Sequence, residues 1–280
     1  MTARIVYQGE PGAFSDLACR EHFPALEPWP CASFAQAFAR VREGAADIAM
    51  IPVENTVAGR VSDIYHLLPG GGLFITAERY QPIHHQLLGL PGAKLSGIRL
   101  ARSHPMALGQ VRESLQRLGI DSEADVDTAA AARKVAERGD SSVAAVASRM
   151  AAQTYNLDIL AEDIEDSGSN TTRFIVLERE MRVPDAEAGP CVSSFVFRLR
   201  SVPSALYKAL GGFASNGLNL TKLESYMVGG TFQAAQFYCD VEGHPDSEAM
   251  RHALEELRFF SDELRHLGSY PADPVRLQQG

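Results

Sequence analysis

Short apolar runs alternate with amphipathic segments along the first two thirds of the chain. The segments Ile5–Tyr7, Ala46–Val53 and Ser142–Ala147 consist largely of apolar residues, which is typical of strands buried on both faces of a parallel sheet. The segment Ser33–Val41 instead spaces its apolar residues as one face of a helix does. The alternation from Ile5 to Leu177 therefore predicts an α/β fold with a mainly parallel sheet.

Two breaks in this alternation indicate two lobes. Three glycines, Gly70–Gly72, precede a long strand-like segment from Leu73 to Leu90, and a new strand and helix unit begins at Ile98. A cleft between two such lobes would collect the polar residues that follow the strand ends. The predicted lobes are about 1–80 with 159–179, and 81–158.

The last third of the chain has a different pattern. Residues 180–191 are charged, contain Pro and Gly and lack an apolar period, so they predict a linker. Beyond it the order βαββαβ extends over 192–271, with 272–280 as a tail, and this order is that of the α+β ferredoxin-like split fold. No catalytic group of residues is evident there, which favours a regulatory or assembly role. The helices are expected from Pro203 to Asn216 and from Ser247 to Arg265, and the middle strands at Leu218–Tyr226 and Thr231–Val241, around Gly229 and Gly230.

A loop of small polar residues begins at Asp166 and runs into a buried strand. Asn170, Thr172 and Phe174 share one parity, so an extended backbone places them on one face, while Arg173 leaves the other side. Polar groups fixed at the end of a rigid strand are typical of small-molecule sites. The same residues are equally consistent with a surface loop whose arginine points to water.

Other strands also end in polar residues, and ligands gather at the carboxyl ends of strands in open α/β sheets. The turn Gly9–Gly12 before a helix offers unpaired N–H groups that suit a carboxylate or a hydroxyl. Helix capping is a compatible explanation at several of these places, as at Ser103 before Pro105. Besides the Thr172 loop, we expect the cleft to contain Glu54, Asn55, Ser103, His104 and Ser148.

Composition limits the classes of function. The chain has 280 residues, 45% apolar and 22% charged, as soluble globular proteins have, and its net charge of -9 argues against a nucleic-acid partner. The four cysteines are scattered, and we expect free thiols. No apolar stretch reaches membrane-span length and the N-terminus lacks a signal-peptide pattern, so we expect no membrane partner and a cytoplasmic location. The adjacent His84 and His85 face opposite ways on a strand and predict no metal site.

Several short motifs, in this order, resemble those of bacterial prephenate dehydratases with a C-terminal ACT domain. They are Tyr7–Ser15, Pro52–Thr56, Ser103–Pro105, Asn170–Phe174 and Gly217–Ser225, and together they cover almost the whole chain. Each motif alone is weak, and their order and number make the resemblance specific.

The resemblance implies a monofunctional lyase that converts prephenate to phenylpyruvate, with loss of carbon dioxide and water, in phenylalanine biosynthesis. It implies no cofactor and a catalytic region, 1–179, of two lobes like those of type II periplasmic binding proteins. Thr172 matches the family's catalytic threonine, which we expect to act as a positioned donor to the leaving hydroxyl. The matching substrate-binding positions are Asn170, Arg173, Phe174, Glu54, Asn55, Thr56, Ser103, His104 and Ser148.

Two further roles follow from the charges of prephenate, which is a dianion. Arg173 can bind a carboxylate bidentately, and we expect the pyruvyl carboxylate because a tight grip on the ring carboxylate would oppose decarboxylation. Glu54 is either the ultimate proton source or a structural carboxylate that binds helix N–H groups.

The ACT domain departs from the family's effector motifs. The family commonly has Gly-Ala-Leu-Val and Glu-Ser-Arg-Pro segments, where this chain has Tyr207 and Tyr226 in place of a small apolar residue and a cation. We expect L-phenylalanine to be an allosteric inhibitor at a reshaped pocket, and the chain to form a homodimer or homotetramer. The expected effector residues are Ser204, Ala205, Leu206, Asn216, Leu218, Asn219, Leu220, Glu224 and Ser225.

Two alternatives stay open. Arogenate dehydratase differs only in tolerating an ammonium group where prephenate has a keto group. The second alternative is a cytosolic amino-acid-binding sensor, with the same two parts but without catalysis. No helix-turn-helix or basic patch supports a sensor, and a sensor has no need of the Thr172–Arg173 pair.

Overall fold

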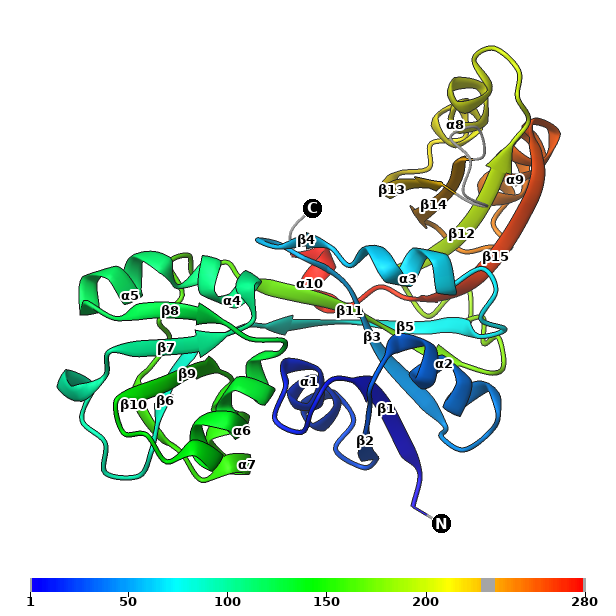
Figure 1. Ribbon diagram of the computed structural model, residues 1–280. Helices are drawn as coiled ribbons and strands as arrows, with labels where there is room; N and C mark the ends of the chain where they lie inside the picture. Colours follow the sequence, from blue (N-terminus) through cyan, green and yellow to red (C-terminus); the bar gives the residue numbers. More distant parts are fainter. Residues whose placement is uncertain (1, 228–234, 279–280) are drawn as a thin grey trace. The chain divides into compact units, whose positions relative to one another are not determined.

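The computed structural model describes residues 2–227 and 235–278, which form two compact units. The first unit comprises 1–40, 46–61 and 80–174, and the second comprises 41–45, 62–79 and 175–280. The predicted Gly229 and Gly230, and the first four residues of the strand predicted from Thr231, lie outside the described residues. Figure 1 shows the helices and strands, and each sheet is treated separately below.

The N-terminal strands belong to a six-stranded sheet of order β2-β1-β3-β11-β5, with β4 paired to β3. Strand β1 pairs in parallel with β2 and β3, and its Ile5 and Val6 are buried, as the apolar pattern predicts. The strands are β1 (Arg4–Gln8), β2 (Glu27–Cys31), β3 (Ile48–Asn55), β4 (Gly59–Arg60), β5 (Phe74–Pro82) and β11 (Thr171–Glu178), and the helices between them are α1 (Phe14–His22), α2 (Phe34–Arg42) and α3 (Ser62–Leu67).

A second sheet, wholly within the first unit, has the order β10-β6-β9-β7-β8 and mixes parallel with antiparallel pairs. Ala144 and Val146 of β9 face one apolar cluster while Ala145 and Ala147 face another, which explains why this strand is apolar at every position. The strands are β6 (Gln86–Gly89), β7 (Leu100–Ser103), β8 (Asp121–Ala124), β9 (Val143–Ala147) and β10 (Asp158–Ala161), with helices α4 (Pro105–Gln110), α5 (Arg112–Leu118), α6 (Thr128–Arg138) and α7 (Arg149–Tyr155) and the 3-10 turn Leu95–Gly97.

The second unit contains a four-stranded antiparallel sheet of order β13-β14-β12-β15. Helices α8 and α9 cover one face of it (Figure 1) and share a core with Phe195, Phe197 and Phe213. The element order confirms the predicted βαββαβ pattern. The elements are β12 (Cys191–Leu199), α8 (Ala205–Ser215), β13 (Leu220–Met227), β14 (Ala235–Glu242), α9 (Glu248–Phe260) and β15 (Ser261–Pro271), followed by the short helix α10 (Pro274–Leu277).

Two predicted elements end elsewhere in the structure. The helix predicted to Arg265 stops at Phe260, because residues 261–271 form β15, which pairs with β12 from Ser261 to Pro271. Sheet pairing overrides the helical character of this charged segment. The strand predicted from Leu73 to Leu90 is divided into β5 and β6 by residues 83–85, where the chain passes from one sheet to the other.

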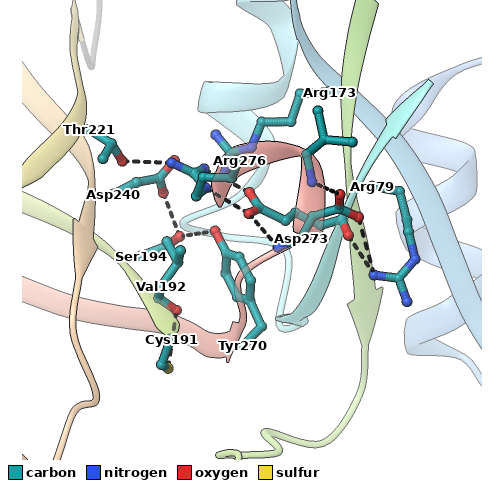
Figure 2. Close-up of polar contacts among 12 residues, drawn as sticks. Arg79, Arg173, Cys191, Val192, Ser194, Thr221, Asp240, Tyr270, Asp273 and Arg276 are labelled. Atoms are coloured by element: carbon teal, nitrogen blue, oxygen red, sulfur yellow. Dashed lines mark hydrogen bonds and ion pairs between the residues drawn. The ribbon is translucent and has the colours of Figure 1, made fainter. Parts of the chain in front are cut away.

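A buried polar network ties the C-terminal segment into the second unit (Figure 2). Arg276 of α10 donates to both carboxylate oxygens of Glu78 on β5, at 2.7 Å each, and to the Thr221 hydroxyl on β13 at 3.0 Å. Glu78 is fully buried and also accepts from the backbone N–H of Asp273 at 3.2 Å. The predicted tail therefore begins as an ordered part of this unit.

No helix in residues 2–227 or 235–278 is long and apolar enough to cross a membrane.

Candidate active site

A cavity of about 340 Å³ opens in the first unit where strands and helices of both of its sheets end. Its wall takes residues from the ends of β1 and β3, the starts of α1, α4, α6 and β11, and the crossing segment 83–85. The wall residues are Gln8, Phe14, Ser15, Pro52, Asn55, Ala58, Val61, Ile83, His85, His104, Met106, Ala107, Gln110, Val126, Asp127, Thr128, Thr172 and Phe174.

Asn55 fixes the polar geometry of this wall. Its Oδ1 accepts from the backbone N–H groups of Val57 and Ala58, at 2.9 and 2.7 Å. Two backbone donors define which end of the amide is oxygen, so Nδ2 must donate. It donates to Asn170 Oδ1 at 2.8 Å and to Thr172 Oγ1 at 2.9 Å. The side chain of Asn55 thus uses both donors and both acceptor sites within the protein.

The Thr172 hydroxyl is oriented by that contact. Its oxygen accepts from Asn55 Nδ2, so its own proton points elsewhere. Thr172 lines the cavity, and no acceptor for its proton is recorded within the part of the chain that the structure describes. The hydroxyl is therefore a positioned hydrogen-bond donor that faces a ligand space.

The same network extends to a histidine that the sequence analysis did not single out for this site. Asn170 Nδ2 donates to Gln110 Oε1 at 2.9 Å, which lies 2.6 Å from His85 Nε2. Because Gln110 Oε1 only accepts, His85 carries its proton on Nε2 and keeps the lone pair on Nδ1. The Nδ1 atom is buried and has no hydrogen-bond partner among the described residues. Burial lowers the pKa of His85, so the ring is neutral near pH 7.

Asp127 is the carboxylic acid of the cavity wall. Its Oδ1 accepts from the N–H groups of Ala129 and Ala130 and so caps α6. Burial raises the pKa of Asp127 despite these bonds. The acid holds the start of α6 at the wall and is easier to protonate than an exposed aspartate.

Arg173 and Glu54 lie together outside the cavity wall. Arg173 is 2% exposed, and its Nη1 donates to Glu54 Oε1 at 2.9 Å. The opposite parities of Thr172 and Arg173 on β11 account for this, as expected for an extended chain. The structure therefore brings both residues next to the site without placing either on its surface.

Three other predicted positions have structural contacts in place of cavity contacts. Ser103 Oγ donates to Val146 O at 2.5 Å, and Ser148 Oγ donates to Gly12 O at 2.6 Å while capping α7. Thr56 Oγ1 donates to Ser169 O at 2.5 Å and accepts from the backbone N–H of Thr171. These hydroxyls hold the loops that carry the site, whereas His104 and Phe174 do line the cavity, as predicted.

No lysine or arginine is among the residues that line the cavity, and residues at the starts of α1, α4 and α6 do line it. Helix α1 begins at Phe14, and no side chain caps its first N–H groups. Phe14 and Ser15 both line the cavity. In the turn before this helix, the N–H groups of Gly9 and Gly12 donate to Cys31 O and Asp16 Oδ2, so the prediction that these groups are unpaired is wrong.

The expected effector residues lie in the second unit, around α8 and β13. Asn219 Nδ2 donates to Glu242 Oε2 at 2.9 Å, and Lys222 Nζ lies 3.3 Å from Glu224 Oε1. Tyr207 is exposed at the start of α8, whereas Tyr226 packs against Tyr65 and His66 of α3. The two tyrosines that depart from the family's motifs thus have different surroundings, and only Tyr226 is held by neighbouring rings.

Gln110 and His85 line the cavity but were not predicted for it from the sequence. Gln110 ends a short helix seven residues after Ser103, and nothing in its local sequence distinguishes it from a surface glutamine. One feature of the sequence could have indicated His85. It is adjacent to His84 on an extended segment, so the two side chains face opposite ways and one of them faces inward.

The fold and the site together define an α/β protein with a cavity that is lined by a threonine hydroxyl held by Asn55. The chain belongs to the prephenate dehydratase family, which matches residues 5–182. It is 47% identical over 272 residues to a bifunctional N-acyl-homoserine lactone acylase/prephenate dehydratase of Komagataeibacter europaeus, covering 97% of each chain. It is 41% identical to the chloroplastic arogenate dehydratase/prephenate dehydratase 1 of Arabidopsis thaliana, covering 98% of this chain and 73% of the relative.

Solved structures show the same relationship. A prephenate dehydratase from Arthrobacter aurescens, solved in complex with L-Phe, matches with a TM-score of 0.88 and 32% identity over 96% of this chain and 90% of that chain. A structure described as a quorum quenching acylase matches with a TM-score of 0.91 and 48% identity over 97% and 99% of the two chains. The similarity therefore extends beyond residues 5–182 to the βαββαβ part.

Proposed function

We propose that the protein catalyses the decarboxylating dehydration of prephenate to phenylpyruvate in L-phenylalanine biosynthesis. The observation that carries this proposal is the Thr172 hydroxyl, whose oxygen accepts from Asn55 and which belongs to a residue that lines the cavity. Membership of the prephenate dehydratase family supports it.

The reaction needs one proton donor and no redox partner. The bond between the ring and its carboxylate breaks and carbon dioxide leaves. The electron pair of the broken bond enters the ring. The C4–O bond breaks in turn, and the departing hydroxide takes one proton to become water. Aromatisation drives the step. The Thr172 O–H donates to the leaving oxygen, and a second group must resupply the proton because a threonine hydroxyl is a weak acid.

The cavity wall suits the two charges of the substrate in different ways. We place the pyruvyl carboxylate at the uncapped start of α1, beside Phe14 and Ser15, since backbone N–H groups and the helix dipole bind anions there. The ring carboxylate faces the apolar part of the wall, which includes Ile83 and Phe174. An apolar environment disfavours the carboxylate relative to neutral carbon dioxide.

Arg173 then has a positioning role in place of the carboxylate contact that we expected from the sequence. Its guanidinium is buried against Glu54, and the pair fixes the end of β3 beside the start of β11. Glu54 directly precedes Asn55. The Arg173–Glu54 pair therefore supports the Asn55 amide, which orients Thr172. A structure with a substrate analogue whose carboxylate contacts Arg173 would overturn this assignment.

The experiment that tests the function supplies prephenate and, in a parallel assay, arogenate to the purified protein. We expect phenylpyruvate from prephenate. Faster formation of phenylalanine from arogenate would favour arogenate dehydratase, a name that several plant relatives bear. Binding of either compound without turnover would favour the amino-acid sensor and contradict the proposal.

Hydrolysis of N-acyl-homoserine lactones is a second candidate function. The relative of Komagataeibacter europaeus carries this activity in its name at 47% identity, and the apolar cavity wall, with Met106 and Val126, suits an acyl chain. We infer that the acylase activity is separable from the prephenate reaction. Release of homoserine lactone in the same assay series measures the acylase activity.

We propose further that 1–179 is the catalytic region, with lobes like those of type II periplasmic binding proteins, and that 192–271 is an ACT regulatory domain. L-Phenylalanine is the proposed effector at Ser204–Leu206, Asn216, Leu218–Leu220, Glu224 and Ser225, and the Arthrobacter aurescens relative was solved with L-Phe. The proposed assembly is a homodimer or homotetramer. A phenylalanine titration that changes neither the rate nor the sedimentation of the protein would contradict this regulation.

A further inference from the structure

The segments that connect the two sheets of the first unit carry a second group of polar residues. One segment, 83–85, joins β5 to β6, and the other, 162–170, joins β10 to β11. They run alongside each other, since His85 O accepts from the backbone N–H of Ile164 and Asn170 O accepts from that of Ile83, both at 2.9 Å. His85 faces the catalytic cavity, and His84, the next residue along the extended chain, lines a different one.

Three possible ligand atoms meet at His84. Its Nδ1 lies 2.8 Å from Glu165 Oε1 and 3.9 Å from Asp163 Oδ1, and all three atoms lie within 4.8 Å of one another. Ligand atoms bound to one transition-metal ion at about 2.0–2.2 Å lie about 3.0–3.5 Å apart. Shifts of about 1 Å or less would therefore bring the group into a coordination geometry.

Both carboxylates are held by groups that are not themselves ligands. Glu165 Oε2 accepts from the backbone N–H of His85 at 2.9 Å, which directs Oε1 toward His84. The Gln86 amide donates to Asp163 Oδ1 at 2.8 Å and accepts from the backbone N–H of Asp163 at 3.3 Å. Contacts of this kind orient ligands in metal sites.

An independent observation comes from Gln81 in the wall of the same cavity, which has a volume of about 510 Å³. Gln81 is 4% exposed, and its Nε2 donates to Glu21 Oε2 at 2.8 Å, which fixes the orientation of the amide. Its Oε1 is buried and has no hydrogen-bond partner in residues 2–227 or 235–278. A buried carbonyl oxygen without a donor is costly, and this one is an oxygen of the kind that cations bind, on a residue of the cavity that His84 and Asp163 also line.

The charges around this cavity also favour a cation. Glu21 and Asp163 line it and Glu165 adjoins it, while its one lining arginine, Arg149, is paired with Glu162 at 3.1 Å. Imidazole nitrogen with carboxylate oxygens is a donor set for Zn²⁺, Co²⁺ or Mn²⁺.

We propose that His84, Asp163 and Glu165 form a binding site for a divalent transition-metal ion that links the two crossing segments. When the ion binds, the imidazole proton resides on Nε2, so that the lone pair of Nδ1 faces the metal and the ring stays neutral. The ion fastens 83–85 to 162–170 on the side away from Thr172, and it takes no part in the chemistry of the catalytic cavity.

The test is a Co²⁺ titration of the full-length protein after treatment with a chelator, followed by visible absorption and by calorimetry. We expect one saturable site, displaced by Zn²⁺, and a higher melting temperature with metal. His84→Ala should weaken binding by at least 100-fold. Gln86→Ala, which removes only the support of Asp163, should weaken it by about 10-fold. Asp163→Asn should also weaken it, and Asn suits the left-handed φ of 49° at this position.

The matched control is His252→Ala, which removes an exposed histidine from α9 and should leave binding unchanged. Loss of the site in His84→Ala but not in His252→Ala supports the proposal. The proposal is overturned by the absence of saturable binding, or by equal binding in the wild type and His84→Ala, which would place the ion elsewhere. These readouts do not depend on turnover, so they remain valid whatever the outcome of the prephenate assay.

Discussion

Each unit contains an arginine–glutamate pair, and the two pairs differ in how far the glutamate side chain is exposed. In the second unit, Arg276 grips both oxygens of Glu78, which is fully buried. In the first unit, Arg173 contacts Glu54 Oε1, and a third of the Glu54 side chain, 33%, remains exposed beside the catalytic cavity. The buried Arg276–Glu78 pair suits a structural connection. The partly exposed Arg173–Glu54 pair instead lies next to residues that line the cavity.

The comparison extends to the hydroxyls of the two networks. In the second unit, the Ser194 hydroxyl contacts the Tyr270 hydroxyl and the buried Asp240 (Figure 2). The Tyr238 hydroxyl also donates to Asp240. At the catalytic cavity, the Thr172 hydroxyl accepts one bond and presents its proton to the ligand space. Satisfied networks add rigidity, and a group held in place with a free donor is ready for chemistry.

Replacement of Thr172 should separate activity from stability. We expect Thr172→Ala to lower turnover of prephenate by about 10²–10⁴-fold, the range for loss of a positioned proton donor. The free energy of unfolding should change by no more than about 1.5 kcal/mol, because one hydrogen bond from Asn55 is lost. Steady-state kinetics and urea unfolding measure the two effects. Thr172→Ser keeps the hydroxyl and is the matched control, and full activity in folded Thr172→Ala would exclude Thr172 from the mechanism.

Replacement of Arg276 should have the opposite profile. Arg276→Met leaves the Glu78 carboxylate buried without its guanidinium, and we expect a loss of about 3–5 kcal/mol in the free energy of unfolding. Urea unfolding followed by circular dichroism measures it, and kcat of the protein that remains folded should change little.

Two further variants sharpen this result. Arg198→Met removes the exposed partner of Glu263 and should cost about 0–1 kcal/mol. The double variant Glu78→Gln/Arg276→Met removes the stranded charge and should recover part of the loss. If Arg276→Met lowers the free energy of unfolding by less than about 1 kcal/mol, the Arg276–Glu78 pair does not hold the C-terminal segment in place.

Much of the fold could be predicted from the sequence where one local pattern dominated. The fully apolar β9 was confirmed because burial on both faces acts over a few residues. Strand β2, with the sequence Glu-Pro-Trp-Pro-Cys, was not predicted, since its two prolines argue against a strand. It lies at the edge of its sheet, where prolines are tolerated.

The site was predicted less completely than the fold, for a physical reason. Thr172, Asn55 and His104 were placed by motif and parity, and they line the cavity. Gln110 and His85 depend on contacts between segments 25 or more residues apart, which no local pattern encodes. The same limit applies to Arg276, whose partner Glu78 is 198 residues away.

The smallest expected effect concerns two histidines, one in each unit, of which His85 is buried and His266 is half-buried. Burial lowers the pKa of His85 in the first unit and of His266 in the second. In the unfolded chain each binds a proton below about pH 6.5, whereas in the folded protein each stays neutral to a lower pH. The unfolded state therefore binds more protons in this range, and stability is lost as the pH falls from about 6.5 through the folded pKa of each ring.

His85→Gln and His266→Gln should each reduce the loss of unfolding free energy between pH 7.5 and pH 5, by at most about 1.4 kcal/mol per unit of pKa shift. The two reductions should add in the double variant, because the histidines lie in separate units. Replacement of the exposed His252 by Gln should leave the pH dependence as in the wild type. If His85→Gln instead steepens the loss below pH 6.5, His85 is protonated in the folded protein, and its Nδ1 carries a proton in addition to the one that Nε2 donates to Gln110.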